Sequence, residues 1–167
     1  MTEDLKTLAE TIKDIKITMF TTVADEGHLY SRPMATLELE PQSFDGRLYF
    51  FTDRHSAKVS SVNSDHHVNL AYSEPSKQRY VSVCGQASLI DDRALMEKLW
   101  SPFMKAWFPE GLEDPNIALL CVEVDSAEIW NSPPSKVVQL VGLAKSLATG
   151  ERFKGEKYQQ HIDVRGH

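Results

Sequence analysis

The order of apolar and polar residues predicts a helix followed by a β-hairpin. Residues at helical spacing predict an N-terminal helix that covers one face of the core: Leu5, Leu8, Ala9, Ile12 and Ile15. From residue 15 to 23 apolar and polar residues alternate, which indicates a half-buried strand. A turn at 24–28 connects it to a second strand at 29–39. Pro33 cannot donate a backbone hydrogen bond, so we expect an edge or a bulge there.

Further alternation predicts four more strands, at 48–52, 67–72, 80–90 and 117–130. On the last-but-one strand, one face is predicted to carry Val81, Val83, Gly85, Ala87 and Leu89. Short helices are expected from Ser56 and from Asp91, and a final helix over 132–150. About six strands with short connections are typical of an antiparallel barrel. We therefore expect a mainly β fold with peripheral helices (α+β), one domain over 1–150 and a polar, mobile tail over 151–167.

Size and charge narrow the function classes. The 167 residues suffice for one core without disulfides or a structural metal. A formal net charge of −6 argues against nucleic-acid binding, which requires a basic surface. No apolar run approaches the roughly 20 residues that span a bilayer, and the acidic N-terminus lacks a signal core, so a cytoplasmic protein is predicted. Cys84 and Cys121 lie in alternating runs and are predicted to be buried thiols.

One segment, Phe51 to Lys58, has the residues of an anion site. The sequence lacks both G-x-G-x-x-G and the P-loop motif, so a phosphate would need side chains and a helix N-terminus. Ser56 offers a hydroxyl, Lys58 an ammonium, and Arg32 on the second strand a guanidinium. The spacing alone favours a plain N-cap at Ser56 and a solvated Lys58 over a phosphate site, and both interpretations stay open.

Other candidate sites are weaker. His66 and His67 are adjacent on a strand and point to opposite faces, so no metal site is predicted. Asp91 and Asp92 precede a helix and are interpreted as a cap rather than as a catalytic pair. No serine has histidine and acid partners at a recognisable spacing, and catalytic residues are not identified. Four clustered aromatics fit core packing or the wall of a ligand or dimer surface: Trp100, Phe103, Trp107 and Phe108.

The order of several short segments resembles the pyridoxamine 5′-phosphate oxidase-like split-barrel superfamily. The resemblance covers about 5–153 and extends, more narrowly, to its general stress protein 26 branch. The segments that carry it are Ser31-Arg32-Pro33-Met34, Leu48-Tyr49-Phe50-Phe51-Thr52, Ser56-Ala57-Lys58, Trp107-Phe108-Pro109-Glu110-Gly111, Trp130-Asn131-Ser132-Pro133 and Lys136-Val137-Val138-Gln139-Leu140.

The resemblance implies a six-stranded split barrel that forms a homodimer with two flavin mononucleotides (FMN) at the interface. Arg32 and Lys58 would then bind the phosphate, with Ser56 beside them. The isoalloxazine ring would be lined by Pro33, Met34, Phe51 and Thr52, with Trp130 contributed by the partner subunit and Trp107 as a weaker candidate for a cover.

Some positions depart from the vitamin B6 oxidases of this superfamily. Ala57 stands where those enzymes usually have arginine, and Tyr80 where they usually have glutamine. The Arg-x-His motif that follows their tryptophan is replaced by Asn131-Ser132-Pro133. The resemblance thus implies an FMN-binding protein, with FAD as an alternative flavin, but argues against vitamin B6 oxidation.

Two functions remain open. The first is a flavin-dependent oxidoreductase of the general stress type that acts on an unknown small molecule. The second is a non-catalytic protein that stores or senses FMN, and a third, weaker option is a relative that binds haem or a deazaflavin in the same groove.

Overall fold

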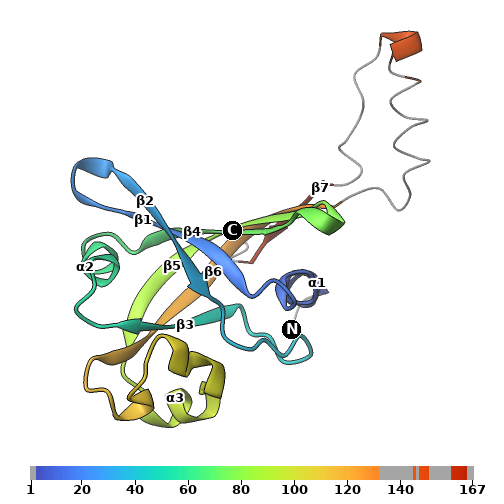
Figure 1. Ribbon diagram of the computed structural model, residues 1–167. Coiled ribbons are helices and arrows are strands. Elements are labelled where there is room, and N and C mark those ends of the chain that lie inside the picture. The colour runs from blue at the N-terminus through green and yellow to red at the C-terminus, as the bar shows by residue number, and fades with distance from the viewer. Residues whose placement is uncertain (1–2, 132–144, 146, 151–158, 165–167) are drawn as a thin grey trace.

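A single curled antiparallel sheet forms the body of the protein (Figure 1). The computed structural model describes residues 3–131, 145, 147–150 and 159–164, so most of the helix expected over 132–150 lies outside the described residues. Six strands follow the order β2-β1-β4-β5-β6-β3, and β7 pairs with β6 beside this path. Their bounds are β1 Ile17–Val23, β2 Leu29–Ala35, β3 Arg47–Asp53, β4 His67–Glu74, β5 Arg79–Ile90, β6 Ile117–Trp130 and β7 Gln159–Asp163.

The sheet curls far enough for its two end strands to meet at one point. Just beyond β2, the backbone N–H of Leu37 donates to the carbonyl of Tyr49 on β3 at 3.0 Å. The helices α1 (Glu3–Ile12), α2 (Ala57–Ser64) and α3 (Arg93–Leu99) lie around this half-barrel (Figure 1). The prediction of a mainly β split barrel with peripheral helices is confirmed. Pro33 lies on β2, an end strand, where its missing N–H costs no ladder bond.

The strands β3 and β6 are buried on both faces, which explains their nearly continuous apolar runs. The inner face contributes Phe50 and Leu120 to the main core. The outer face contributes Phe51 and Leu119 to a second cluster, which packs beneath α3 and the turns that follow it. The second cluster therefore lies directly against the segment predicted to bind phosphate.

The strand β1 is half buried, through the face that carries Thr18, Phe20 and Thr22. Phe20, Thr18 and Thr22 are completely buried, whereas Ile17 and Met19 are 43% and 42% exposed. Alternation gives the period of a strand, but only the packing of other elements decides which face is covered.

The long strand β5 has the inward face that the sequence predicts, and this face includes a required glycine. A Cβ on Gly85 would lie 2.4 Å from the carbonyl oxygen of Glu123, at a register shift between β5 and β6. The prediction of two buried thiols is half wrong: Cys121 is buried, but Cys84 is exposed on the outer face of β5.

Two further expectations need correction. The N-cap of α3 is Asp92, whose carboxylate accepts from the N–H of Leu95 at 3.0 Å, whereas Asp91 forms an ion pair with Arg54 at 3.4 Å. Residues 159–163, expected in a mobile tail, form β7 instead. Ile162 explains this difference, because it is completely buried within the main core and fixes the strand against β6.

Candidate functional site

A pocket of about 300 Å³ opens where β2, β3, the start of α2 and the turns after α3 converge. The sheet order places β2 and β3 at opposite ends, and the curl of the sheet brings them together here. Its lining comprises Arg32, Pro33, Met34, Ala35, Phe51, Thr52, Asp53, Lys58, Met104, Trp107 and Phe108. Six of the eight predicted binding residues are therefore assembled around one cavity, which we call the β2–β3 pocket.

Ser56, the seventh predicted residue, adjoins the β2–β3 pocket through hydrogen bonds. It stands at the N-cap position of α2, yet its side chain makes no capping hydrogen bond. Its hydroxyl instead accepts from the ammonium of Lys58 at 3.2 Å and lies 3.4 Å from the hydroxyl of Thr52. The structure thus favours a polar cluster over the plain N-cap that the sequence left open.

The guanidinium of Arg32 is held from behind by strand β1. Its Nη1 donates to the hydroxyl of Thr22 at 2.8 Å and, more weakly, to the carbonyl of Phe20 at 3.4 Å. These bonds use one nitrogen of the planar fork. The orientation of the group is therefore fixed before any ligand is bound.

Electrostatics at the pocket indicate an unsatisfied positive charge. Burial lowers the pKa of Lys58, the nearby charge of Arg32 lowers it further, and Asp53 opposes both effects. Burial also lowers the pKa of Arg32. Two partly desolvated cations that repel each other are stabilised by an anion between them. The arrangement therefore suits a phosphate better than a neutral group.

The loop between β3 and α2 is fixed by its own backbone and by β6. The carboxylate of Asp53 accepts from the N–H of His55 at 2.7 Å. The N–H of Arg54 donates to the carbonyl of Asn116 at 2.8 Å, and its guanidinium donates to the carbonyl of Ile117 at 3.2 Å. In α2 (Ala57–Ser64) the N–H groups of Val59 and Ser60 donate to the carbonyl of Ser56. The two N–H groups before them, at the first turn, are the ones that helix geometry leaves available to an anion.

Aromatic residues form the opposite side of the pocket. Phe51 contacts Trp100 and Phe108 edge to face, with ring centroids 5.4 and 6.3 Å apart. Phe103 and Trp107 contact each other at 5.0 Å and are 63% and 53% exposed. The four aromatics thus serve both roles that the sequence left open: Trp100 packs on the second cluster, while Trp107 and Phe108 line the pocket.

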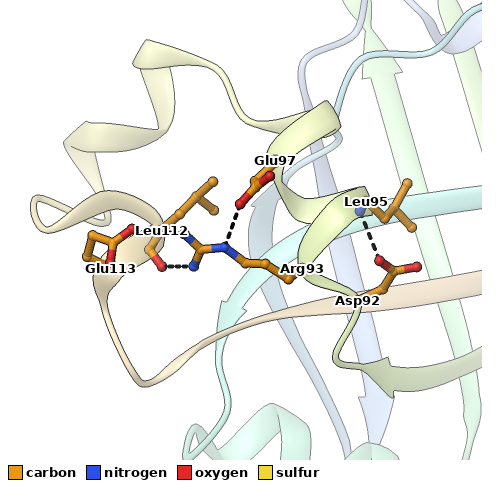
Figure 2. Close-up of polar contacts among 6 residues, drawn as sticks. All are labelled: Asp92, Arg93, Leu95, Glu97, Leu112 and Glu113. Carbon is orange, nitrogen blue, oxygen red and sulfur yellow. Dashed lines mark hydrogen bonds and ion pairs between the residues drawn. The ribbon is translucent and has the colours of Figure 1, made fainter.

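Arg93 ties together the two ends of the segment that carries this aromatic wall (Figure 2). From α3 it forms ion pairs with Glu97 at 2.9 Å and with Glu113 at 2.8 Å. It also donates to the backbone carbonyl of Leu112, within η4 (Gly111–Glu113). The chain between these contacts includes η3 (Pro102–Ala106), which places Met104 in the pocket.

Trp130, the eighth predicted residue, does not line the pocket of its own chain. It is the last residue of β6, lies opposite Tyr80 of β5 and Gln159 of β7, and is 39% exposed. Sequence reasoning missed Asp53 and Met104. Met104 carries no local signal, because only the path of the chain after α3 brings it to β2.

His66 and His67 have local partners. The ring of His67 pairs with Asp65 at 2.8 Å, and Nδ1 of His66 lies 3.2 Å from the carbonyl oxygen of Ala87. Across the described ranges, no three His, Cys, Asp or Glu residues gather as potential metal ligands. In the same part of the chain, no helix is both long and apolar enough to cross a membrane.

Comparison with known proteins shows the family of the chain. The family model described as "Pyridoxamine 5'-phosphate oxidase like" matches residues 3–154. The chain belongs to this family. Two curated relatives agree with this assignment. Protein bli-3 of Neurospora crassa is 32% identical over 145 residues, which are 81% of this chain and 68% of that protein. General stress protein 26 of Bacillus subtilis is 30% identical over 89 residues, which are 53% of this chain and 63% of that protein.

A solved structure supports the same placement within the pyridoxamine 5′-phosphate oxidase-like family. It is described as a general stress FMN/FAD binding protein from Xanthomonas citri and is 29% identical, with a TM-score of 0.67. The match covers 80% of this chain and 93% of that one. The predicted family, with its likeness to general stress protein 26, is confirmed.

Proposed function

We propose that this family member binds FMN in the β2–β3 pocket, as a homodimer, and uses it as an oxidoreductase for a small molecule. The observation that carries the proposal is the cluster of Ser56, Lys58 and Arg32. At the start of α2 lie a hydroxyl that makes no capping bond and the partly desolvated ammonium of Lys58, and the partly desolvated Arg32 of β2 lines the same pocket. Charge-assisted bonds of this kind contribute roughly 1.5–3 kcal/mol each, so a few could supply the ~8 kcal/mol of a micromolar ligand.

The flat part of the cofactor would lie along the rest of the pocket. Pro33 and Met34 offer backbone groups on the end strand β2, and Phe51 and Thr52 offer the facing edge of β3. The pocket has about 300 Å³, which is the lower end of the ~300–1,000 Å³ that enclose small molecules. One chain by itself therefore supplies only part of the enclosure that a flavin needs.

A second copy of the chain could complete the site through the outer face of the sheet. This face carries exposed apolar side chains, among them Met19, Tyr80 and Trp130. The register aligns Pro33 with Met19 across the β2 end of that face, and Trp130 lies near its β6 end. A two-fold interface pairs opposite ends of the same patch. It would bring Trp130 of one subunit toward Pro33 and the ring site of the other.

The bound flavin would supply hydride or electron transfer, so the protein needs no general acid or base of its own. The ionisable residues of the pocket are Arg32, Asp53 and Lys58, which lie at the phosphate end. The chain's residues would then bind the phosphate, orient the ring and exclude water from its covered side. The Xanthomonas protein's description as FMN/FAD binding supports a flavin, and the titration below compares both.

The test is a titration of FMN, and separately of FAD, with the full chain, followed by flavin fluorescence. Saturable quenching is expected, and Lys58→Ala and Arg32→Ala should each weaken FMN binding by tenfold or more. Lys77→Ala is the matched control, because Lys77 is an exposed lysine whose ammonium pairs with Glu74 at 2.8 Å on a distant turn. Wild-type protein that does not quench either flavin would refute the proposal.

Two further measurements test the dimer and the oxidoreductase activity separately. Light scattering should show a dimer, and Trp130→Ala should weaken FMN binding although Trp130 does not line the pocket of its own chain. Steady-state oxidation of NADPH or NADH by the loaded protein should distinguish an oxidoreductase from a protein that only stores FMN. A loaded dimer without turnover with a range of acceptors would favour storage or sensing.

A further inference from the structure

We propose that a second cavity, between the β2–β3 connection and η3, binds an uncharged planar aromatic molecule. Its relation to a flavin rests on the proposed flavin function, because the cavity adjoins the β2–β3 pocket. The cavity measures about 530 Å³, within the ~300–1,000 Å³ typical of small-molecule sites. Ala35 and Met104 line both spaces, so a molecule in the second cavity would lie next to the flavin ring.

The interior of the second cavity is apolar and rich in groups that contact aromatic rings. Its apolar lining consists of Ala35, Leu37, Leu99, Trp100, Phe103 and Met104. Aromatic rings associate edge to face, and methionine sulfur makes favourable contacts with ring edges. Phe103 is 63% exposed, which leaves its ring available to a ligand.

The rim of the cavity explains why the ligand should carry no charge. Lys16 and Lys98 contribute two positive charges, and Glu38 and Glu40 contribute two negative ones. All four residues are exposed, and their charges sum to zero. An anion or a cation would lose hydration on entering an apolar space without meeting a net opposite charge. A neutral aromatic ring loses little hydration free energy on entering and is stabilised by the burial of its apolar surface.

The wall between the two spaces is packed rather than open. Phe51, which lines the β2–β3 pocket, touches Trp100 of the second cavity with ring centroids 5.4 Å apart. On the other side, the hydroxyl of Thr36 lies 3.0 Å from that of the buried Tyr72, which fixes the end of β2. A flavin and this aromatic ligand could therefore be bound at the same time, with Met104 and Ala35 between them.

The test uses 2-naphthol and 2-naphthalenesulfonate, which share one ring system and differ in charge at pH 7. Each is titrated calorimetrically into the full chain, with and without saturating FMN. We expect 2-naphthol to bind at least tenfold more tightly than the sulfonate, and saturation with FMN to leave its affinity within about twofold. Equal affinities, or displacement by FMN, would overturn the inference.

Two variants locate the binding. Ser101→Trp puts an indole into the second cavity, and because Ser101 makes no capping bond at η3, its hydroxyl is dispensable. This change should abolish 2-naphthol binding, and Phe103→Ala should weaken it about fivefold. Tyr30→Ala, which removes an exposed aromatic outside the lining, should leave it unchanged. Thermal melts by circular dichroism identify a variant that fails to fold, and the other variant then decides.

The outcomes separate this inference from the flavin proposal. FMN binding without 2-naphthol binding, or 2-naphthol binding that is insensitive to both variants, would overturn the second site alone. Binding of 2-naphthol that Ser101→Trp abolishes, in a protein that does not bind FMN, would support the second site and refute only the flavin proposal.

Discussion

The hydroxyl oxygen of Ser56 lies 3.2 Å from the ammonium nitrogen of Lys58, although Ser56 occupies the N-cap position of α2. A serine at this position usually accepts a hydrogen bond from the second or third N–H of its helix. Here the side chain turns toward the β2–β3 pocket instead. The start of α2 thus lacks one capping bond, as the proposed phosphate site would require.

Ser56→Ala should therefore affect ligand binding more than folding. We expect FMN affinity to fall about three- to tenfold, because a hydroxyl beside the phosphate is lost. The loss of unfolding free energy should stay below the ~1 kcal/mol typical of a lost cap, because no capping bond exists. Fluorescence titration and urea denaturation measure the two quantities.

The matched control for this change is Ser61→Ala in the same helix. The hydroxyl of Ser61 donates to the carbonyl of Ala57 at 3.1 Å, within α2. Its removal should leave FMN affinity unchanged. A Ser56→Ala variant that destabilises the fold by more than ~1 kcal/mol and binds FMN normally would show that Ser56 is structural.

The lowered pKa of Lys58 predicts how ligand binding depends on pH. Burial and Arg32 favour the neutral amine, whereas a phosphate needs the ammonium. FMN affinity should therefore fall as pH rises through this lowered pKa, below the range where an ordinary lysine loses its proton. Lys58→Arg should remove this alkaline loss, because arginine stays charged. Titrations of both proteins across alkaline pH test it, and parallel curves would assign the loss to another group.

The same lysine predicts a pH effect on the stability of the ligand-free protein. A lysine pKa lowered by folding means that the folded state binds the proton less tightly than the unfolded chain. Its charge then opposes folding below the lowered pKa, and this cost declines as pH rises through it. Lys58→Met should stabilise the ligand-free protein at neutral pH and remove this part of its pH dependence. Denaturant unfolding at several pH values measures both effects.

Two buried threonines on β1 should respond in opposite ways to replacement by valine. Thr18 and Thr22 are both completely buried. The hydroxyl of Thr18 has no hydrogen-bond partner among the described residues, whereas that of Thr22 accepts from Arg32 at 2.8 Å. Thr18→Val should raise the free energy of unfolding by about 1 kcal/mol, since an unpaired buried polar group costs roughly 1–3 kcal/mol.

Thr22→Val should instead lower stability by about 1 kcal/mol and weaken FMN binding, because Arg32 loses the acceptor that orients it. Valine and threonine have nearly the same shape and β-propensity, so the pair isolates the hydroxyl. Urea denaturation and FMN titration of both variants decide the matter. Equal effects of the two substitutions would contradict the assigned hydrogen bonds.

Arg93 should control the mobility of the aromatic wall rather than the stability of the barrel. Arg93→Ala removes the contacts with Glu113 and Leu112 that hold the segment after α3 (Figure 2). Amide hydrogen exchange over 100–113 should become at least several-fold faster, and FMN affinity should fall modestly. Exchange in β5 should stay unchanged, because exposed ion pairs contribute little to global stability.

Arg47 provides the control for this variant. It is equally exposed and also has two carboxylate partners, Asp45 and Glu123, but it lies at the other end of β3. Arg47→Ala should leave exchange over 100–113 at the wild-type rate. If both variants accelerate exchange in that segment equally, Arg93 has no special role there.

The sequence by itself determined the strands β1 to β6, the edge or bulge at Pro33, the inward face of β5 and the segment that carries Ser56 and Lys58. These features are local: alternation, a missing N–H and the chemistry of neighbouring residues are readable along the chain. The residues themselves also suggested Arg32, and the family resemblance added Pro33, Met34 and Trp130. The wall formed by the end of β3 and the start of α2 could therefore be predicted.

Only the tertiary structure decided which face of each strand is covered and which distant segments meet. Thr18 and Thr22 are buried while Met19 is exposed, because elements distant in the sequence pack on only one side of β1. Met104 reaches the pocket because α3 and η3 fold back over β3, and residues 159–163 pair with β6 because Ile162 is buried in the core. Such contacts arise from packing between elements far apart in the chain, so the local periodicity of the sequence does not predict them.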